Sequence, residues 1–425
     1  MLLFAASAVI SLVYAAHQAV TDQPDFGAQY AGGRAVVLHR DPYDGSVISG
    51  IEASTESSAA AQGYAFLGPP PTALAMALFG MLPFRTASMI WFALIVAAQA
   101  ACGIVVLRLV SPNRSAVLYA AATAAALDFA FGRNAIGLGQ DDPIIAAVVL
   151  CGVALAAGGQ PLRGGIVGGL ATLKPQVLLG PALALAAGKR ARILGGAVLG
   201  AGGLVLAAAV SGWLGASVAS WGEWRALVAQ ARNRPTGLVL IGGIVAAAVA
   251  AVIFAVRFVW ARRSGRPPSL IALVAAGTLV NAVVGPLIYL HLQSDDLVIL
   301  PAGMLAAWVF ARTETRLSLP VTFLTGIGAG CLLGNALSSV AYYAGGAHAL
   351  LHLGITALLL GGVVCIRQAL APAAAIAIVV NTGLTVIPFR PAWLDAFAVA
   401  IALALLVLLG AVSTDPRWSL NPGRS

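Results

Sequence analysis

The feature that most constrains the fold of this chain is a succession of apolar runs, each about 20 residues long, with short loops between them. A helix of that length spans the hydrocarbon core of a bilayer and satisfies its own backbone hydrogen bonds there. Of the 425 residues, 60% are hydrophobic and 9% are charged, and we find no polar stretch long enough for a separate soluble domain. The sequence therefore predicts an all-α polytopic membrane protein that forms a single integral-membrane domain over residues 1–425.

The apolar runs predict about 12 membrane spans. The first, residues 2–20, could instead be a cleaved signal peptide, but the basic residues that usually begin such a peptide are missing, so we expect a retained span. The other predicted spans are 86–109, 115–133, 143–158, 193–212, 236–260, 268–290, 297–311, 318–341, 348–366, 371–388 and 394–412.

Two further apolar segments, 64–83 and 164–188, are interrupted by proline. The first contains Pro69-Pro70-Pro71 and the second contains Lys174-Pro175. Proline removes a backbone donor and kinks or ends a helix, so we predict re-entrant or broken helices in both segments. Non-helical backbone at membrane depth is tolerated where it is buried in protein or lines a water-filled cavity, so these breaks indicate a site.

The net charge of +9 is better explained by membrane topology than by nucleic-acid binding, because the basic residues lie in short loops between apolar runs. With the N-terminus inside and both broken segments returning to their own side, the basic loops fall on the cytoplasmic side. The outer side then receives most of the acidic residues and the polar first loop 21–63, in which we expect juxtamembrane helices. Glu52 and Glu56 in this loop are expected to be solvated.

Several polar side chains in the predicted outer loops suit chemistry on a sugar phosphate. Asp25 follows the first span, and a carboxylate there can take the proton of an attacking hydroxyl group, although an aspartate could also simply cap a helix. Lys174 lies at a helix break, and an ionisable group at membrane depth is by default a functional hypothesis; the alternative is that it snorkels to water.

The remaining polar residues predict how a sugar phosphate would be held. Arg133 and His291, together with Lys174, can neutralise a phosphate leaving group. The amides of Asn134 and Gln140 suit sugar hydroxyl groups. Glycoside hydrolysis fits less well, because no second carboxylate can be placed opposite Asp25. We expect no cofactor and no metal, since these cations can hold the phosphate and no clear cluster of metal ligands exists. The four cysteines (Cys102, Cys151, Cys331 and Cys365) lie in apolar runs without metal-binding spacing, as expected for buried free thiols.

Five local patterns follow one another within residues 20–300. They are Asp25-Phe26-x3-Tyr30 with Asp41-Pro42-Tyr43-Asp44, Tyr64-x4-Pro69-Pro70 with Leu82-Pro83, Gly139-Gln140-Asp141-Asp142, Gly168-Gly169-Leu170-Ala171-Thr172-Leu173-Lys174-Pro175, and Tyr289-x5-Asp295-Asp296-Leu297. In this order they resemble the bacterial membrane glycosyltransferases of the GT-C superfamily. The most similar branch is glycosyltransferase family 87, which includes polyprenyl-phosphate-mannose-dependent mannosyltransferases and a mycobacterial arabinofuranosyltransferase.

The resemblance implies inverting transfer of mannose or arabinofuranose from a polyprenyl-phosphate donor to a glycolipid or envelope glycan, with membrane lipids around the enzyme. It implies a bacterial inner (plasma) membrane location with the active site on the extracytoplasmic side. Asp25 would be the general base, and Tyr30, Tyr64 and Asp296 would contact substrate. A GT-C-like catalytic core would cover residues 1–315, followed by C-terminal helices over 316–425.

This sequence also departs from the family pattern. Asp142 stands where the family commonly has Asn, Asp295 stands where Tyr is usual, and the aromatic residue before Pro69-Pro70 is displaced. Donor recognition could therefore differ from that of the characterised members.

Two other classes of protein remain open at this point. A transporter or flippase for a lipid-linked substrate would use the same lysine and broken helices, but would place polar residues along a path rather than on one face. A non-catalytic membrane scaffold would leave Asp25 and Lys174 without a purpose. The concentration of carboxylates on the predicted outer side favours the enzyme.

Overall fold

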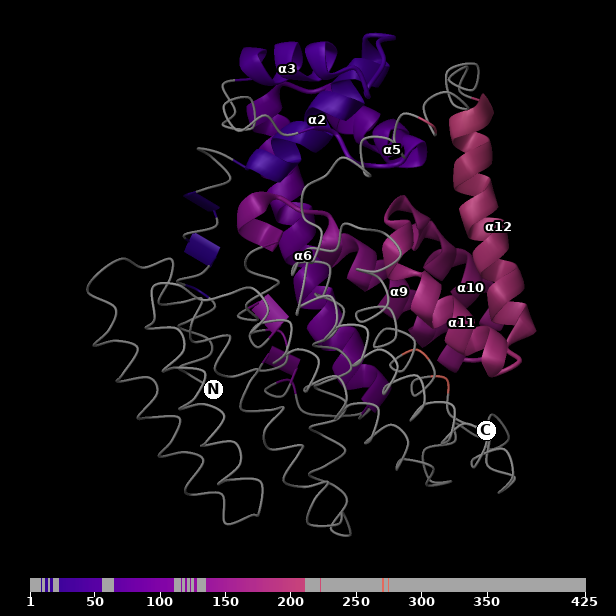
Figure 1. Ribbon diagram of the computed structural model, residues 1–425. Helices are drawn as coiled ribbons and strands as arrows, with labels where there is room; N and C mark the ends of the chain where they lie inside the picture. The colour runs from indigo at the N-terminus through magenta and orange to yellow at the C-terminus, as the bar shows by residue number, and fades with distance from the viewer. Residues whose placement is uncertain are drawn as a thin grey trace, which may run out of the picture.

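The computed structural model describes residues 23–55, 65–110 and 135–210, together with single residues elsewhere, and this part of the chain is helical with no strands (Figure 1). Apart from single residues, the predicted spans 2–20 and 115–133 and all those that begin at 236 or later lie outside the described residues, as do the helices of 316–425. The all-α prediction is therefore confirmed for the described residues, and the number of spans stays a prediction.

The polar first loop contains two helices, α2 (Pro24–Val37) and α3 (Gly45–Ser54), which lie against each other (Figure 1). Proline is favoured in the first turn of a helix, where its missing N–H is not needed, and Pro24 begins α2 in this way. The Asp44 carboxylate caps α3 by accepting from the backbone N–H of Ser46 at 2.8 Å. Helices in the first loop were predicted, and both are present.

Helix α5 (Pro70–Gly80) packs closely along α2. It begins directly after Pro69, so the three prolines mark the start of a helix in this segment. A Cβ atom on Gly33 would meet the Met76 carbonyl oxygen, and one on Gly80 would meet the backbone of Arg34. Small residues on both helices therefore set their separation.

Three predicted spans correspond to α6 (Phe84–Val110), α9 (Asp142–Ala157) and α12 (Ala191–Ala208). Within the described residues, Phe84–Val105 of α6 and the whole of α12 are long and apolar enough to cross a membrane. Helix α9 is apolar but shorter.

The break predicted near Lys174 is present. Helix α10 (Pro161–Gly169) continues into one 3-10 turn, η1 (Leu170–Leu173), and a second, η2 (Pro175–Val177), follows before α11 (Leu179–Ala187). Lys174 lies between the two turns with a non-helical backbone, and a residue that precedes proline is disfavoured in the helical region.

An aromatic cluster fixes the start of α2 on α6. The Phe26 ring stacks on the Trp91 ring, with centroids 5.5 Å apart, and on the Phe84 ring at 5.9 Å. Phe79 meets both Phe26 and Trp91 edge-on. Stacked and edge-on aromatic pairs each stabilise a core by roughly 0.5–1.5 kcal/mol beyond the area they bury. Because Asp25 precedes Phe26, this cluster determines where the Asp25 carboxylate lies.

Candidate active site

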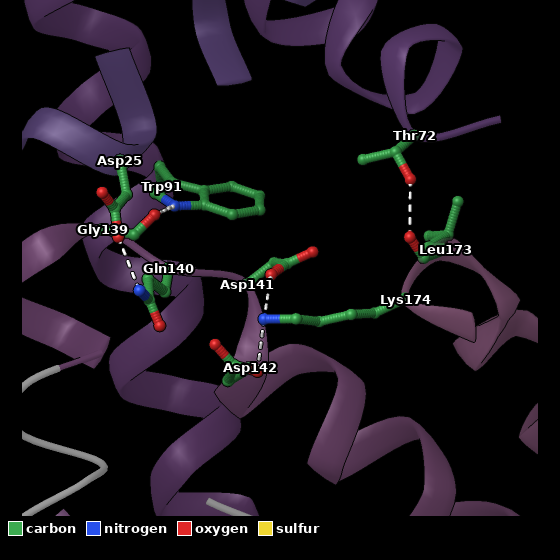
Figure 2. Close-up of polar contacts among 9 residues, drawn as sticks. All are labelled: Asp25, Thr72, Trp91, Gly139, Gln140, Asp141, Asp142, Leu173 and Lys174. Atoms are coloured by element: carbon green, nitrogen blue, oxygen red, sulfur yellow. Dashed lines mark hydrogen bonds and ion pairs between the residues drawn. The ribbon is translucent and has the colours of Figure 1, made fainter. Parts of the chain in front are cut away.

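Asp25 is hydrogen-bonded to Gln140, a residue 115 positions away in sequence (Figure 2). Gln140 Nε2 donates to Asp25 Oδ2 at 2.6 Å. Asp25 lies in the first turn of α2, whereas the capping position belongs to Gln23, so the interpretation of Asp25 as a helix cap is wrong. The two residues that the sequence predicted for the base and for a sugar contact are thus brought together.

Burial raises the pKa of Asp25 above the ordinary value of an aspartate, and this is the largest effect on that group. The hydrogen bond from Gln140 acts in the opposite direction, as does the positive charge of Lys174, while the charge of Asp141 raises the pKa further. A carboxylate with a raised pKa is a stronger base than an exposed aspartate, and its proton affinity is better matched to neutral pH.

Gln140 is held in place by the turn that precedes it. The N–H of Gln140 donates to the Ala135 carbonyl at 2.8 Å, and the N–H of Gly139 donates to the Ile136 carbonyl at 3.3 Å. Gly139 adopts a φ of +78°, so this is a left-handed helix terminus of the Schellman type. A Cβ atom on Gly139 would approach Phe26 Cβ to 2.7 Å, so glycine is required for close approach as well as for conformation.

A buried polar network joins this turn to α2 and α6. Trp91 Nε1 donates to the Gly139 carbonyl at 2.7 Å. Gln23 is fully buried; its Nε2 donates to the Ile136 carbonyl at 3.3 Å, and its Oε1 accepts from Ser88 Oγ at 3.0 Å. None of these residues was predicted as part of the site. Gln23 could have been suspected from its place beside the Asp25-Phe26 pattern, whereas nothing in the sequence indicated Ser88 or Trp91.

Lys174 forms ion pairs with both carboxylates at the start of α9 (Figure 2). Its Nζ lies 2.6 Å from Asp142 Oδ1 and 3.5 Å from Asp141 Oδ1. The Asp142 side chain is almost fully buried, with 3% exposed, so a positive partner is needed to offset its desolvation. Asp142, which departs from the asparagine common in the family pattern, therefore orients Lys174.

The helix break that carries Lys174 is attached to α5. The Thr72 hydroxyl donates to the Leu173 carbonyl at 2.7 Å, across 101 positions of sequence (Figure 2). Thr72 follows the three prolines, so both proline-interrupted segments meet at this contact. That the two breaks mark a functional site stays a prediction.

Some predicted site residues have other surroundings, and some lie outside the described residues. The Tyr30 hydroxyl donates to the Leu82 carbonyl at 2.8 Å, and its ring packs edge-on against Phe84 in the aromatic cluster. The structure gives Tyr30 a packing role, and its contact with substrate stays a prediction. The remaining predicted site residues are outside the described part of the chain: Tyr64, Arg133, Asn134, His291 and Asp296.

The expectation that Glu52 is solvated is wrong. Glu52 lies in α3 with its side chain fully buried, and its carboxyl oxygens accept no hydrogen bond from any residue that the structure describes. Burial raises the pKa of Glu52 to about 7. Among the described residues, no group of three or more His, Cys, Asp or Glu side chains is placed to hold a metal ion.

Comparison with known proteins identifies the family of this chain. Residues 66–286 match the model of glycosyltransferase family 87. The match covers more than half of the 425 residues, so the chain belongs to this family of membrane glycosyltransferases. It includes Gln140 and Lys174, whereas Asp25 precedes it. Neither a curated protein nor a solved structure matches the chain.

Proposed function

We propose that this glycosyltransferase moves mannose or arabinofuranose from a polyprenyl-phosphate donor to a hydroxyl group of a glycolipid or envelope glycan. Transfer takes place with inversion, at the outer face of the bacterial inner membrane. The observation that carries the proposal is the partly buried Asp25–Gln140 pair, with an electrostatic influence on Asp25 from Lys174. A base and a cation within one cluster are what acid–base chemistry on a sugar phosphate requires.

Asp25 acts as the general base in this proposal. Its carboxylate accepts the proton of the acceptor hydroxyl while that oxygen forms a bond to the anomeric carbon of the donor sugar. The bond from the anomeric carbon to the phosphate oxygen breaks, and polyprenyl phosphate leaves with the electron pair. The hydrogen bond from Gln140 fixes the carboxylate, so that Oδ1 remains available for the incoming hydroxyl group.

Lys174 balances the charge that develops on the leaving phosphate. Its ammonium carries three donors, so it can contact Asp142 and a phosphate oxygen together. Three carboxylates (Asp25, Asp141 and Asp142) face this ammonium among the described residues, so further positive charge is needed at the phosphate. Arg133 and His291 remain our candidates for that charge.

The polyprenyl chain of the donor needs an apolar surface beside this cluster. Helix α12 exposes large apolar side chains along its length, including Val198, Leu199 and Leu206. Helix α6 exposes Met89, Ile90 and Leu94 within its first turns. Exposed apolar surface on two helices long enough to span a bilayer supports contact with lipid or with a lipid-linked donor.

The test is transfer by the purified protein. Radiolabelled polyprenyl-phosphate-mannose and polyprenyl-phosphate-arabinofuranose would each be offered with a membrane lipid extract, to wild type, Asp25→Asn and Asp44→Asn. We expect a labelled product from one donor with wild type, and a loss of at least about a hundredfold in rate with Asp25→Asn, the size expected for removal of a general base. Asp44→Asn is the matched control, because asparagine caps a helix as well as aspartate does.

Two outcomes would contradict the proposal. Transfer by Asp25→Asn at the wild-type rate would exclude Asp25 as the base. A lack of product from either donor, with folded protein, would favour transport of a lipid-linked substrate, which a lipid-flipping assay would measure.

A further inference from the structure

We infer that Trp91 is a positioning residue for the transfer reaction, because its contacts hold Gln140 against Asp25. The inference rests on the proposed function, in which Asp25 is the base. Trp91 lies on α6 and is buried, and its indole N–H donates to Gly139 rather than to Asp25 or Gln140. Trp91 contacts instead a chain neighbour of each residue: Phe26, next to Asp25, and Gly139, next to Gln140.

On one side, the Trp91 ring stacks on the Phe26 ring at 5.5 Å, and Phe26 follows Asp25 in α2. On the other side, Trp91 Nε1 donates to the carbonyl of Gly139, which precedes Gln140 (Figure 2). One rigid side chain therefore sets both ends of a contact between residues that are 115 positions apart. The Gln140–Asp25 distance of 2.6 Å leaves little tolerance, since hydrogen bonds weaken steeply with poor geometry.

A second contact from α6 holds the same turn. Ser88 Oγ donates to Gln23 Oε1, and Gln23 Nε2 donates to the Ile136 carbonyl, one turn before Gly139. Ser88 and Trp91 are three residues apart and so lie on one face of α6. This face of α6 thus provides two attachments for the helix terminus that carries Gln140.

The indole N–H is the part of Trp91 that a phenylalanine lacks. A Trp91→Phe variant would keep an aromatic ring against Phe26 and lose the donor to Gly139, leaving a buried carbonyl without its partner. The turn would then relax, and the Gln140 hydrogen bond to Asp25 would lengthen.

Loss of that hydrogen bond raises the pKa of Asp25, because the contact from Gln140 is the largest of the effects that lower it. Lys174 lowers the pKa and Asp141 raises it, and both effects are separate from the contacts that Trp91 makes with Phe26 and Gly139. The other charged or titratable groups nearby have contacts or positions elsewhere. Asp142 is paired with Lys174, the Tyr30 hydroxyl donates to the Leu82 carbonyl, and the Arg34 guanidinium donates to the Gly80 carbonyl. Arg85 lies at the exposed first turn of α6.

The experiment compares the pH dependence of kcat for wild type, Trp91→Phe and Gln99→Met. We expect the acid limb of Trp91→Phe to move to higher pH, and kcat on that limb to fall by about tenfold with little change in KM. Gln99→Met is the matched control: Gln99 lies two turns further along α6 and makes a buried hydrogen bond to the Ala126 carbonyl at 2.7 Å, away from the turn. Its thermal stability should fall while its acid limb stays in place.

A double-mutant cycle tests whether Trp91 acts through Gln140. In a Gln140→Leu background, where the hydrogen bond to Asp25 is already lost, Trp91→Phe should cause no further shift of the acid limb. An unshifted limb in Trp91→Phe alone, or a full additional shift in the double variant, would overturn the inference. If Trp91→Phe does not fold, Ser88→Ala provides the second variant, with a smaller shift expected in the same direction.

A readout without turnover separates failure of this inference from failure of the proposed function. A hydrophobic carbodiimide adds to protonated carboxyl groups, so modification of Asp25 against pH, followed by peptide mass spectrometry, measures its protonated fraction. The midpoint should lie at higher pH in Trp91→Phe than in wild type, and equal midpoints would overturn the inference. If wild type transfers no sugar while the midpoints differ, the positioning holds and the assigned reaction is wrong.

Discussion

At the scale of single residues, Glu52 is expected to make the free energy of unfolding depend on pH. Its folded-state pKa of about 7 lies above its ordinary value of 4.5, because burial disfavours the charged form. The folded state therefore holds the proton more tightly than the unfolded state. The free energy of unfolding is expected to fall as pH rises from about 4.5 to about 7, and to change no further above that pH through this group.

Glu52→Gln is expected to remove this dependence. An uncharged amide cannot ionise, so the variant should gain about 1–3 kcal/mol over wild type at pH 8 and little at pH 4.5. Thermal unfolding of both proteins in detergent at several pH values would measure the difference. Parallel pH profiles for the two proteins would show that Glu52 is solvated after all.

The site illustrates which residues can be predicted from sequence. Asp25, Gln140 and Lys174 were predicted, because each carries a polar group that an apolar chain has little reason to keep. The partners of Lys174 were not, since the Asp142 contact depends on how the broken helix meets the start of α9. Gln23 and Trp91 donate to backbone carbonyl groups, which any residue carries, so the sequence does not indicate these contacts. Ser88 donates to the Gln23 side chain, and that contact depends on how α6 meets the start of α2.

At the scale of helices, α10 is the element whose packing depends most on glycine. A Cβ atom on Gly165 would meet the Ile193 carbonyl oxygen of α12, and one on Gly164 would meet the Gly152 carbonyl oxygen of α9. Helix α10 therefore lies between α9 and α12 with backbone in contact on both sides, as in other tightly packed membrane helices (Figure 1).

Gly165→Ala is expected to destabilise the protein by about 1–3 kcal/mol, because a methyl group cannot fit without separating α10 from α12. Gly168→Ala is the matched control on the same helix: nothing lies within 4 Å of the added Cβ atom, and alanine favours helix by up to about 1 kcal/mol. Thermal midpoints in detergent would measure both. A similar midpoint for the two variants would mean that α10 and α12 are not in close contact.

The helices themselves were easier to predict than their association. Proline fixes φ and lacks a donor, so the break at Lys174-Pro175 follows from local chemistry alone and is present where predicted. The helix beginning at Pro70 follows from the same chemistry, since proline is accepted in the first turn. The Thr72–Leu173 contact that joins the two segments spans 101 positions, and no periodicity in the sequence indicates it.

At the scale of the whole molecule, the proposed reaction requires the Asp25 side of the protein to face outward. Polyprenyl-phosphate sugars are the donors proposed for that side, and the charge distribution over the loops predicts the same orientation. Helix α3 follows the Asp25 helix and exposes Ser49, whereas the loop before α12 leads to the exposed Arg192, which the charge rule assigns to the cytoplasm.

Single cysteines at these two positions test the orientation in a background whose four native cysteines are replaced. Ser49→Cys should react with a membrane-impermeant maleimide in intact spheroplasts, because the outer solution reaches α3 directly. Arg192→Cys should react only after the membrane is permeabilised. The reverse pattern would place Asp25 in the cytoplasm, and nucleotide sugars, which are available there, would then replace polyprenyl-phosphate sugars as the donors to test. Labelling of both positions in intact spheroplasts would mean that the chain crosses the membrane an even number of times between them, which would contradict the predicted orientation.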